Sequence, residues 1–197
     1  MAVETRREVE AGRREQLLKA ARKVFAEKGY GKATVSDVVR EAGVAQGTFY
    51  LYFPSKKAIL VTLAREFRAA LLGAIFAPEL AALPARERGR AMVRAAFRVS
   101  RDNPDLVRAL HLGLELEDLE DPDLQGSDVV ERVAAFLRDK VRPPGFRGMD
   151  PEIAARLVCC LVEDAALECF VCEDGGRAQH YEDTLVEMID RILWHEP

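Results

Sequence analysis

Apolar residues recur along this chain every three or four positions, which is the spacing of amphipathic helices. Residues 17–25 follow this spacing, and Gly29 just beyond them is a residue type that commonly ends a helix. Residues 34–42 repeat the pattern and stop at Gly43, and a third, shorter segment ends before Pro54. The N-terminal quarter is therefore predicted to form three consecutive helices.

The rest of the chain continues the same periodicity between proline and glycine breaks. Ser55 is suited to cap a long helix that runs from Lys56 towards Phe76. Asp150 followed by Pro151 is a strong helix start, because the carboxylate can cap the helix and proline fits its first position. Further helices are predicted over residues 85–101, 104–119, 127–141, 150–173 and 177–195. With no alternating strand pattern and no internal repeat, the predicted fold class is all-α.

The length and composition are those of a globular protein. The 197 residues, 49% of them hydrophobic, are enough to bury one substantial core and a small second module. No apolar run approaches the ~20 residues that a membrane-spanning helix requires. Residues 1–16 are polar and charged, which does not fit a signal peptide. We therefore expect a soluble, cytoplasmic protein.

Charge is distributed unevenly along the chain. Residues 1–57 hold 12 Lys and Arg against 7 Asp and Glu, although the whole chain has a formal net charge of −4. A basic head on an acidic body suggests that the head binds a polyanion, whereas a similar bias also occurs on ordinary solvated surfaces. Residues 1–12 are expected to precede the first helix as a frayed terminus, the alternative being a basic arm that reaches a minor groove.

Residues 34–50 have the pattern of two helices joined by a tight turn, which is the arrangement of a helix-turn-helix. Gly43 permits the left-handed backbone that such a turn favours, and Val44 can fill the junction between the helices. The pattern predicts a DNA-binding motif, with a helical hairpin of solvated polar residues as the alternative.

The second helix of this motif has one polar and one aromatic side. At about 100° per residue, Gln46, Gly47 and Tyr50 share one arc. A Gln amide can bond an adenine edge through both its ends, and Gly47 lets the backbone approach a groove closely. The other arc can pack inward and carries Phe49, Tyr52 and Phe53. The donors suited to phosphate oxygens are Thr34, Thr48, Tyr50, Tyr52 and Lys56.

Residues 14–60 resemble the DNA-binding domain of TetR-family repressors. The motifs that carry the resemblance are Ala20-Ala21, Phe25 to Tyr30, Thr34-Val35, Ala42-Gly43-Val44 and Gly47 to Lys56. The resemblance implies a helix-turn-helix DNA-binding domain over residues 1–54 and an effector-binding and dimerisation domain over residues 55–197. It implies base or groove contacts by Ala45, Gln46, Gly47 and Thr48, and contacts to the DNA backbone by Thr34, Ser36, Tyr50, Tyr52 and Lys56.

The last two predicted helices are the candidates for a dimer interface. Helix-turn-helix proteins usually bind as dimers, because one recognition helix reads few base pairs. The first of them, over residues 150–173, carries two apolar stripes, which is wider than one core requires. TetR-family proteins pair such helices into a four-helix bundle. The predicted dimerisation residues are Ala154, Val158, Leu161, Ala165, Leu185, Met188, Ile189 and Ile192. The alternative is that both stripes are buried within one subunit.

Bulky apolar residues in the middle helices form either an ordinary core or, as the resemblance implies, a cavity for an apolar effector. The candidate ligand-binding residues are Phe67, Phe97, Leu110, Leu114 and Phe136. An acyl thioester or a fatty acid is one candidate effector. A flat aromatic or cationic compound is another, given the acidic residues Glu115, Glu117, Glu163 and Asp164.

The cysteines are gathered late in the chain, at positions 159, 160, 169 and 172. Their spacing does not form a zinc site, so no metal or cofactor is predicted. They are expected to be buried small hydrophobes, with a redox-sensitive crosslink as the alternative. Since no catalytic motif occurs, we predict a homodimeric repressor that binds a palindromic DNA operator and is released by a small apolar effector. An activator, or a repressor controlled by redox or by a protein partner, is the alternative.

Overall fold

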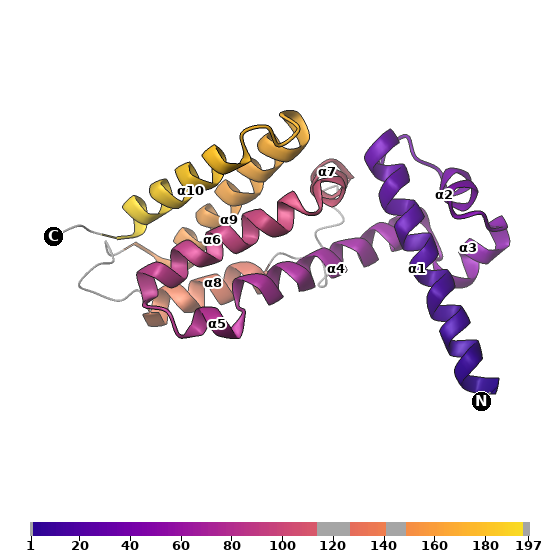
Figure 1. Ribbon diagram of the computed structural model, residues 1–197, viewed down its shortest axis with the longest axis horizontal. Helices are drawn as coiled ribbons and strands as arrows, with labels where there is room; N and C mark the ends of the chain where they lie inside the picture. The colour runs from indigo at the N-terminus through magenta and orange to yellow at the C-terminus, as the bar shows by residue number, and fades with distance from the viewer. Residues whose placement is uncertain (1, 114–126, 141–148, 195–197) are drawn as a thin grey trace.

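The computed structural model describes residues 2–113, 127–140 and 149–194 of the chain. It is helical over nearly all of them, which confirms the predicted all-α fold class. A small head and a larger body lie at opposite ends, and helix α4 (Lys56–Ile75) runs from one into the other (Figure 1). No described helix is long and apolar enough to cross a membrane.

The head contains three helices, α1 (Ala2–Lys28), α2 (Val35–Ala42) and α3 (Gln46–Tyr52). Because α1 begins at Ala2, the prediction that residues 1–12 precede the first helix was wrong. Leu17, Phe25 and Phe49 have no exposed surface and lie in one apolar core. Phe25 also packs edge-on against Tyr30 at a centroid distance of 5.3 Å. This core fixes the positions of α2 and α3 on α1.

The core of the head does not stop at the predicted domain boundary between residues 54 and 55. It includes Ile59, Leu60 and Leu63 from the first half of α4. It also includes Leu106 and Ala109 from α7 (Pro104–Gly113). The head and the body therefore share two helices, and neither helix can move without disturbing both parts.

A polar contact reinforces the packing of α1 against α7. The guanidinium of Arg22 donates to Asp105 Oδ2 at 2.8 Å and to Asn103 Oδ1 at 2.8 Å. The pKa of Arg22 is raised, chiefly by its hydrogen bond to Asp105. This contact ties the first helix of the head to the start of a helix of the body.

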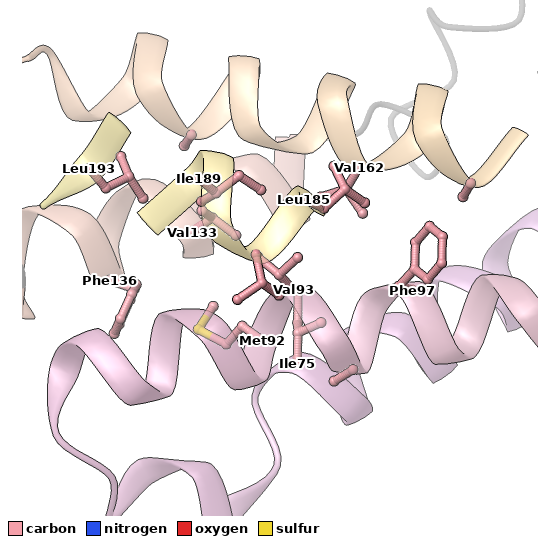
Figure 2. Packing of buried hydrophobic residues seen from close by; sticks show 14 of the residues in the cluster. Ile75, Met92, Val93, Phe97, Val133, Phe136, Val162, Leu185, Ile189 and Leu193 are labelled. Atoms are coloured by element: carbon pink, nitrogen blue, oxygen red, sulfur yellow. The ribbon is translucent and has the colours of Figure 1, made fainter. Parts of the chain in front are cut away.

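The body is a bundle around a second apolar core, part of which is drawn in Figure 2. Side chains from α6, α8, α9 and α10 meet there, among them Val93, Phe136, Val162 and Ile189. The elements of the body besides α4 and α7 are α5 (Pro78–Ala81), α6 (Ala85–Arg101), α8 (Ser127–Lys140), α9 (Pro151–Leu167), the π-helical turn η2 (Glu168–Cys172) and α10 (Ala178–Leu193).

A buried carboxylate joins α6 to α10. Asp190 is 5% exposed and accepts hydrogen bonds from Arg86 and Arg90, with the shortest N–O distances 2.6 Å and 2.7 Å. Although burial acts in the opposite direction, the hydrogen bonds from Arg86 and then Arg90 lower the pKa of Asp190 to about 2. The carboxylate is therefore ionised at neutral pH, and it pairs with two guanidinium groups.

Two features of the body depart from the predicted helices. The short helix α5 was not predicted, and the predicted helix over residues 150–173 changes at Glu168 from α-helix to the π-helical turn η2. The Glu173 N–H donates to the carbonyl of Glu168 at 3.0 Å, a five-residue step that rotates the following side chains away from the earlier stripe. Within this turn Cys169 is buried, whereas Cys172 is exposed.

Candidate DNA-binding surface and ligand cavity

Helix α3 is held by its aromatic side and presents its polar side to solvent. Phe49 is fully buried and Phe53 is 3% exposed, and their ring centroids lie 5.9 Å apart. Gln46 and Gly47 are exposed, and Tyr50 is 53% exposed. The two arcs predicted from the sequence are thus present. An amide, a bare stretch of backbone and a phenol face outward together.

The turn before α3 has the geometry that its sequence predicts. Gly43 adopts the left-handed conformation with φ of 65°, and its N–H donates to the carbonyl of Arg40 at 3.2 Å. Val44 N–H donates to the carbonyl of Val39 at 3.0 Å. A residue with a Cβ would be strained at this φ, so glycine at position 43 sets the angle between α2 and α3.

The start of α2 is fixed by a reciprocal cap. The Thr34 hydroxyl accepts from the Asp37 N–H at 3.2 Å, and the Thr34 N–H donates to Asp37 Oδ2 at 3.1 Å. Lys28 donates to Asp37 Oδ1 at 2.6 Å. The hydrogen bond from Lys28, followed by the one that the Thr34 hydroxyl donates to Asp37 Oδ2, holds the pKa of Asp37 well below its usual range. Thr34, which was predicted to contact phosphate, therefore already uses its hydroxyl to cap the helix.

Lys56 has a role inside the head that the sequence did not reveal. Its ammonium donates to the carbonyl oxygens of Tyr30 at 2.7 Å and Ala33 at 2.8 Å. The ammonium nitrogen also lies 4.3 Å from the centroid of the Tyr30 ring, and burial lowers the pKa of Lys56. Two of its three N–H groups thus hold the segment between α1 and α2, and the contact of Lys56 with phosphate stays a prediction.

The remaining predicted DNA contacts lie on or near the outer surface of the head. Ser36 and Ala45 are exposed, whereas Thr48 and Tyr52 are half-buried. Ala45 is the N-cap of α3 but supplies no side-chain hydrogen bond to it. These residues belong to α2, to α3 and to the turn between them, the same helix-turn-helix that carries Gln46 and Tyr50.

The body encloses a cavity of about 450 Å³ between α4, α6, α7, α8, α9 and α10. Three of the predicted ligand-binding residues line it, namely Phe67, Leu110 and Phe136. Phe97 does not, because it is buried against Phe170 with the ring centroids 4.7 Å apart. Leu114 lies outside the described residues. The sequence could not distinguish cavity-lining residues from core residues, because aromatic residues of both kinds recur at the same helical spacing.

The cavity is mostly apolar, with a few charged groups in its wall. Arg68, His111 and Glu163 contribute to the lining from three different helices. Burial raises the pKa of Glu163, although His111 and Arg68 act in the opposite direction. Trp194, the single tryptophan of the chain, also lines the cavity. Apolar walls with a few polar groups are typical of sites that bind small molecules.

The predicted dimerisation residues divide between the core and the surface. Ala154, Leu185 and Ile189 are at most 5% exposed and belong to the core of their own subunit, so their assignment to a dimer interface is corrected. Three others are half-buried and pack against the same core, namely Val158, Leu161 and Ala165. Only Met188 and Ile192 are exposed, at 44% and 45%.

A different pair on α9 completes an exposed apolar face. Ile153 is 61% exposed and Leu157 is 64% exposed, one helical turn apart. Met188 and Ile192 on α10 have the same four-residue spacing. The two helices lie side by side on the outside of the body (Figure 1). We call these four residues the α9–α10 face.

The four cysteines are free thiols in different environments. Cys169 is buried and Cys159 is half-buried, but Cys160 and Cys172 are exposed, so the prediction that all four are buried was wrong in part. Burial raises the pKa of Cys159 to about 12 and also raises that of Cys169. For the exposed Cys172, partial desolvation and the neighbouring Glu168 raise the pKa. Thiols with raised pKa values form little thiolate and react slowly. Among the described residues, no group of three His, Cys, Asp or Glu side chains is arranged to hold a metal.

A buried aromatic side, an outward polar side and a left-handed glycine turn together define a helix-turn-helix motif. The family model described as "Bacterial regulatory proteins, tetR family" matches residues 17–63. The match confirms, for these residues, the resemblance to the DNA-binding domain of TetR-family regulators that was stated from the sequence.

Curated relatives match over short stretches of the chain. The uncharacterised HTH-type regulator YvdT of Bacillus subtilis is 52% identical over 56 residues, covering 28% of this chain and 29% of YvdT. The fatty acid metabolism regulator protein of B. subtilis is 49% identical over 51 residues, or 26% of each protein. The chain thus spans about a third or less of the length of these relatives.

Solved structures match over nearly the whole chain. FadR of B. subtilis, solved in complex with stearoyl-CoA, is 19% identical and aligns with a TM-score of 0.77, covering 91% of this chain and 98% of FadR. A tetR-family protein from Rhodococcus RHA1 is 22% identical with a TM-score of 0.79, covering 94% and 98%. At these identities the likeness establishes the fold of both head and body.

Proposed function

We propose that the protein is a transcriptional repressor that binds a palindromic DNA operator as a homodimer and is released by a small apolar effector. The observation that carries the proposal is the outward side of α3. Gln46 and Tyr50 are exposed there beside Gly47, while Phe49 fixes the helix in the head. A short, firmly anchored helix with such a side is suited to the major groove, where each base pair has its own pattern of hydrogen-bonding groups.

Replacing Gln46 tests this proposal. An operator is first selected from random duplexes with the purified protein, and dissociation constants are then measured for every single base-pair variant by fluorescence anisotropy. Gln46→Ala is expected to lose about 10- to 100-fold of discrimination at one base pair of each half-site, because a well-placed amide contributes roughly 1–3 kcal/mol of base preference. Affinity for random duplex should be unchanged.

Gln179→Ala is the matched control, since Gln179 is also exposed but lies on α10 of the body. It should leave every dissociation constant unchanged. A uniform loss with Gln46→Ala at all positions would show that Gln46 does not read a base. Failure to select any sequence would refute the proposed function.

The dimer part of the proposal rests on the α9–α10 face. The four exposed apolar side chains of this face lie in two pairs with helical spacing, so the face of a second copy can cover them. Dimers place two recognition helices about one turn of DNA apart, roughly 34–36 Å, which requires a palindromic operator.

The effector part rests on the two helices that the head and the cavity share. In α4, Leu63 belongs to the head core and Phe67 lines the cavity one turn later. In α7, Leu106 belongs to the head core and Leu110 lines the cavity. A ligand that shifts either helix would therefore change the position of α3. Such coupling requires only that the ligand prefer one arrangement of the bundle.

Stearoyl-CoA is the probe for the effector, because it is bound by FadR of B. subtilis, which shares this fold. We expect stearoyl-CoA to change the fluorescence of Trp194 and to release the operator, since its apolar chain fits an apolar cavity. Coenzyme A alone should do neither. Ala96→Phe, which adds a ring to the cavity lining, should abolish both effects, whereas Ala70→Phe on the exposed side of α4 should retain them. If Ala96→Phe still shows the change in Trp194 fluorescence and the release of the operator, the effector binds outside this cavity.

A further inference from the structure

Leu51 is an exposed apolar side chain on the helix proposed to bind DNA. At 81% exposure it is the most exposed of the large hydrophobic side chains in the described residues. It lies next to the polar arc of Gln46, Gly47 and Tyr50, and it does not pack against the core of the head. A leucine in this place has no donor or acceptor for a phosphate or for the polar edge of a base.

The position of Leu51 follows from the buried side of α3. Phe49 and Phe53 are buried and mark the inward direction of the helix. At about 100° per residue, Leu51 is about 160° from each of them, so it projects almost directly away from the head. Figure 1 shows α3 on the outer side of the head, away from the body. Leu51 therefore lies on the part of α3 that would enter furthest into a groove.

Gly47 precedes Leu51 by one helical turn and lies on the same outward side. An added Cβ at Gly47 would meet no atom of the chain within 4 Å. Its backbone is not in the left-handed region either, so nothing within the protein requires glycine there. Gly47 is the second residue of α3, where glycine favours the helical backbone less than alanine does. Its presence is explained if another molecule approaches the backbone closely at this point, beside Leu51.

We infer that Leu51 contacts the 5-methyl group of a thymine in each half-site and is a specificity-determining residue. The inference rests on the proposed function, because it requires α3 in the major groove. The thymine methyl is the apolar group that the major groove offers, and it distinguishes thymine from cytosine and from both purines. The bare backbone at Gly47 lets the groove floor come close enough for an aliphatic side chain to reach it.

Deoxyuridine tests the contact, because it lacks only the 5-methyl group and keeps the base pairing of thymine. Each thymine of the selected operator is replaced in turn, and dissociation constants are measured for the wild type and for Leu51→Ala. The wild type should lose about 3- to 10-fold in affinity at one thymine per half-site, the effect of leaving one apolar carbon uncovered. Leu51→Ala should bind the thymine and the uridine operators equally at that position.

Three outcomes are distinguishable. If the wild type binds its operator but no uridine substitution weakens it, the inference is overturned and the proposed function stands. If Leu51→Ala keeps the full sensitivity to uridine, another residue reads the methyl and the inference is again overturned. If the wild type selects no sequence at all, the proposed function fails, and the inference fails with it. Equal denaturant midpoints for Leu51→Ala and wild type confirm that the head is intact.

Discussion

Asp190→Ala is expected to lower the free energy of unfolding of the body by about 3 kcal/mol at pH 7. Removing one partner of a buried ion pair typically costs about 3–5 kcal/mol, because the remaining charge is left unpaired. Arg86 and Arg90 would lose their shared carboxylate, but their side chains are 34% and 42% exposed and retain some hydration. The effect should therefore lie at the lower end of that range. Urea denaturation followed by the fluorescence of Trp194 measures it.

Glu187→Ala is the matched control for Asp190. Glu187 lies on the same helix and pairs with Arg191 at 2.6 Å, but the two side chains are 62% and 77% exposed. Exposed pairs contribute about 0–1 kcal/mol, so this variant should unfold at nearly the wild-type urea concentration. An equally large loss of unfolding free energy in both variants would show that the burial of Asp190 is not the reason for the destabilisation.

The contribution of Asp190 should also depend on pH. Its pKa in the folded protein is about 2, lower than the ordinary value of 3.8. A lowered pKa means that the carboxylate stabilises the fold fully above pH 3.8 and that this contribution is lost as the pH falls through about 2. The difference in unfolding free energy between wild type and Asp190→Ala should therefore be constant from pH 7 to pH 5 and shrink below pH 3.8.

Leu157→Glu is expected to convert the proposed dimer to a monomer and to weaken operator binding by about 100-fold or more. Leu157 is 64% exposed, so the change should leave the fold of one subunit intact. In a dimer the same position would be buried, and two carboxylates would be placed in an apolar interface. The loss in affinity follows because two linked recognition helices bind far more tightly than one. Light scattering during gel filtration gives the oligomeric state, and anisotropy gives the affinity.

Leu83→Glu is the control for the dimer prediction. Leu83 is also an exposed leucine, at 36%, but it lies near α5 rather than on the α9–α10 face. This variant should remain a dimer and bind the operator with wild-type affinity. A Leu157→Glu protein that is still dimeric would place the interface on another surface.

The head was predictable from the sequence because its signals are local. Glycine at position 43 indicates the left-handed turn between α2 and α3. The aromatic and polar arcs of α3 follow from the helical repeat alone. The hydrogen bonds from Lys56 to the carbonyls of Tyr30 and Ala33 were not predictable, since they join residues 26 and 23 positions apart in the sequence.

The body shows what a periodic pattern leaves undecided. The sequence by itself determined the all-α fold class and a helix-turn-helix that begins near position 34. It also determined that the predicted helix over residues 150–173 carries two apolar stripes. Only the tertiary structure decided which side of each helix is covered: Ala154 and Ile189 are buried, whereas Ile153 and Leu157 are exposed. It also decided that Phe67 lines a cavity, whereas Phe97 is buried in the core. The physical reason is that periodicity records which residues of a helix share a side, whereas burial depends on which neighbouring helices cover that side.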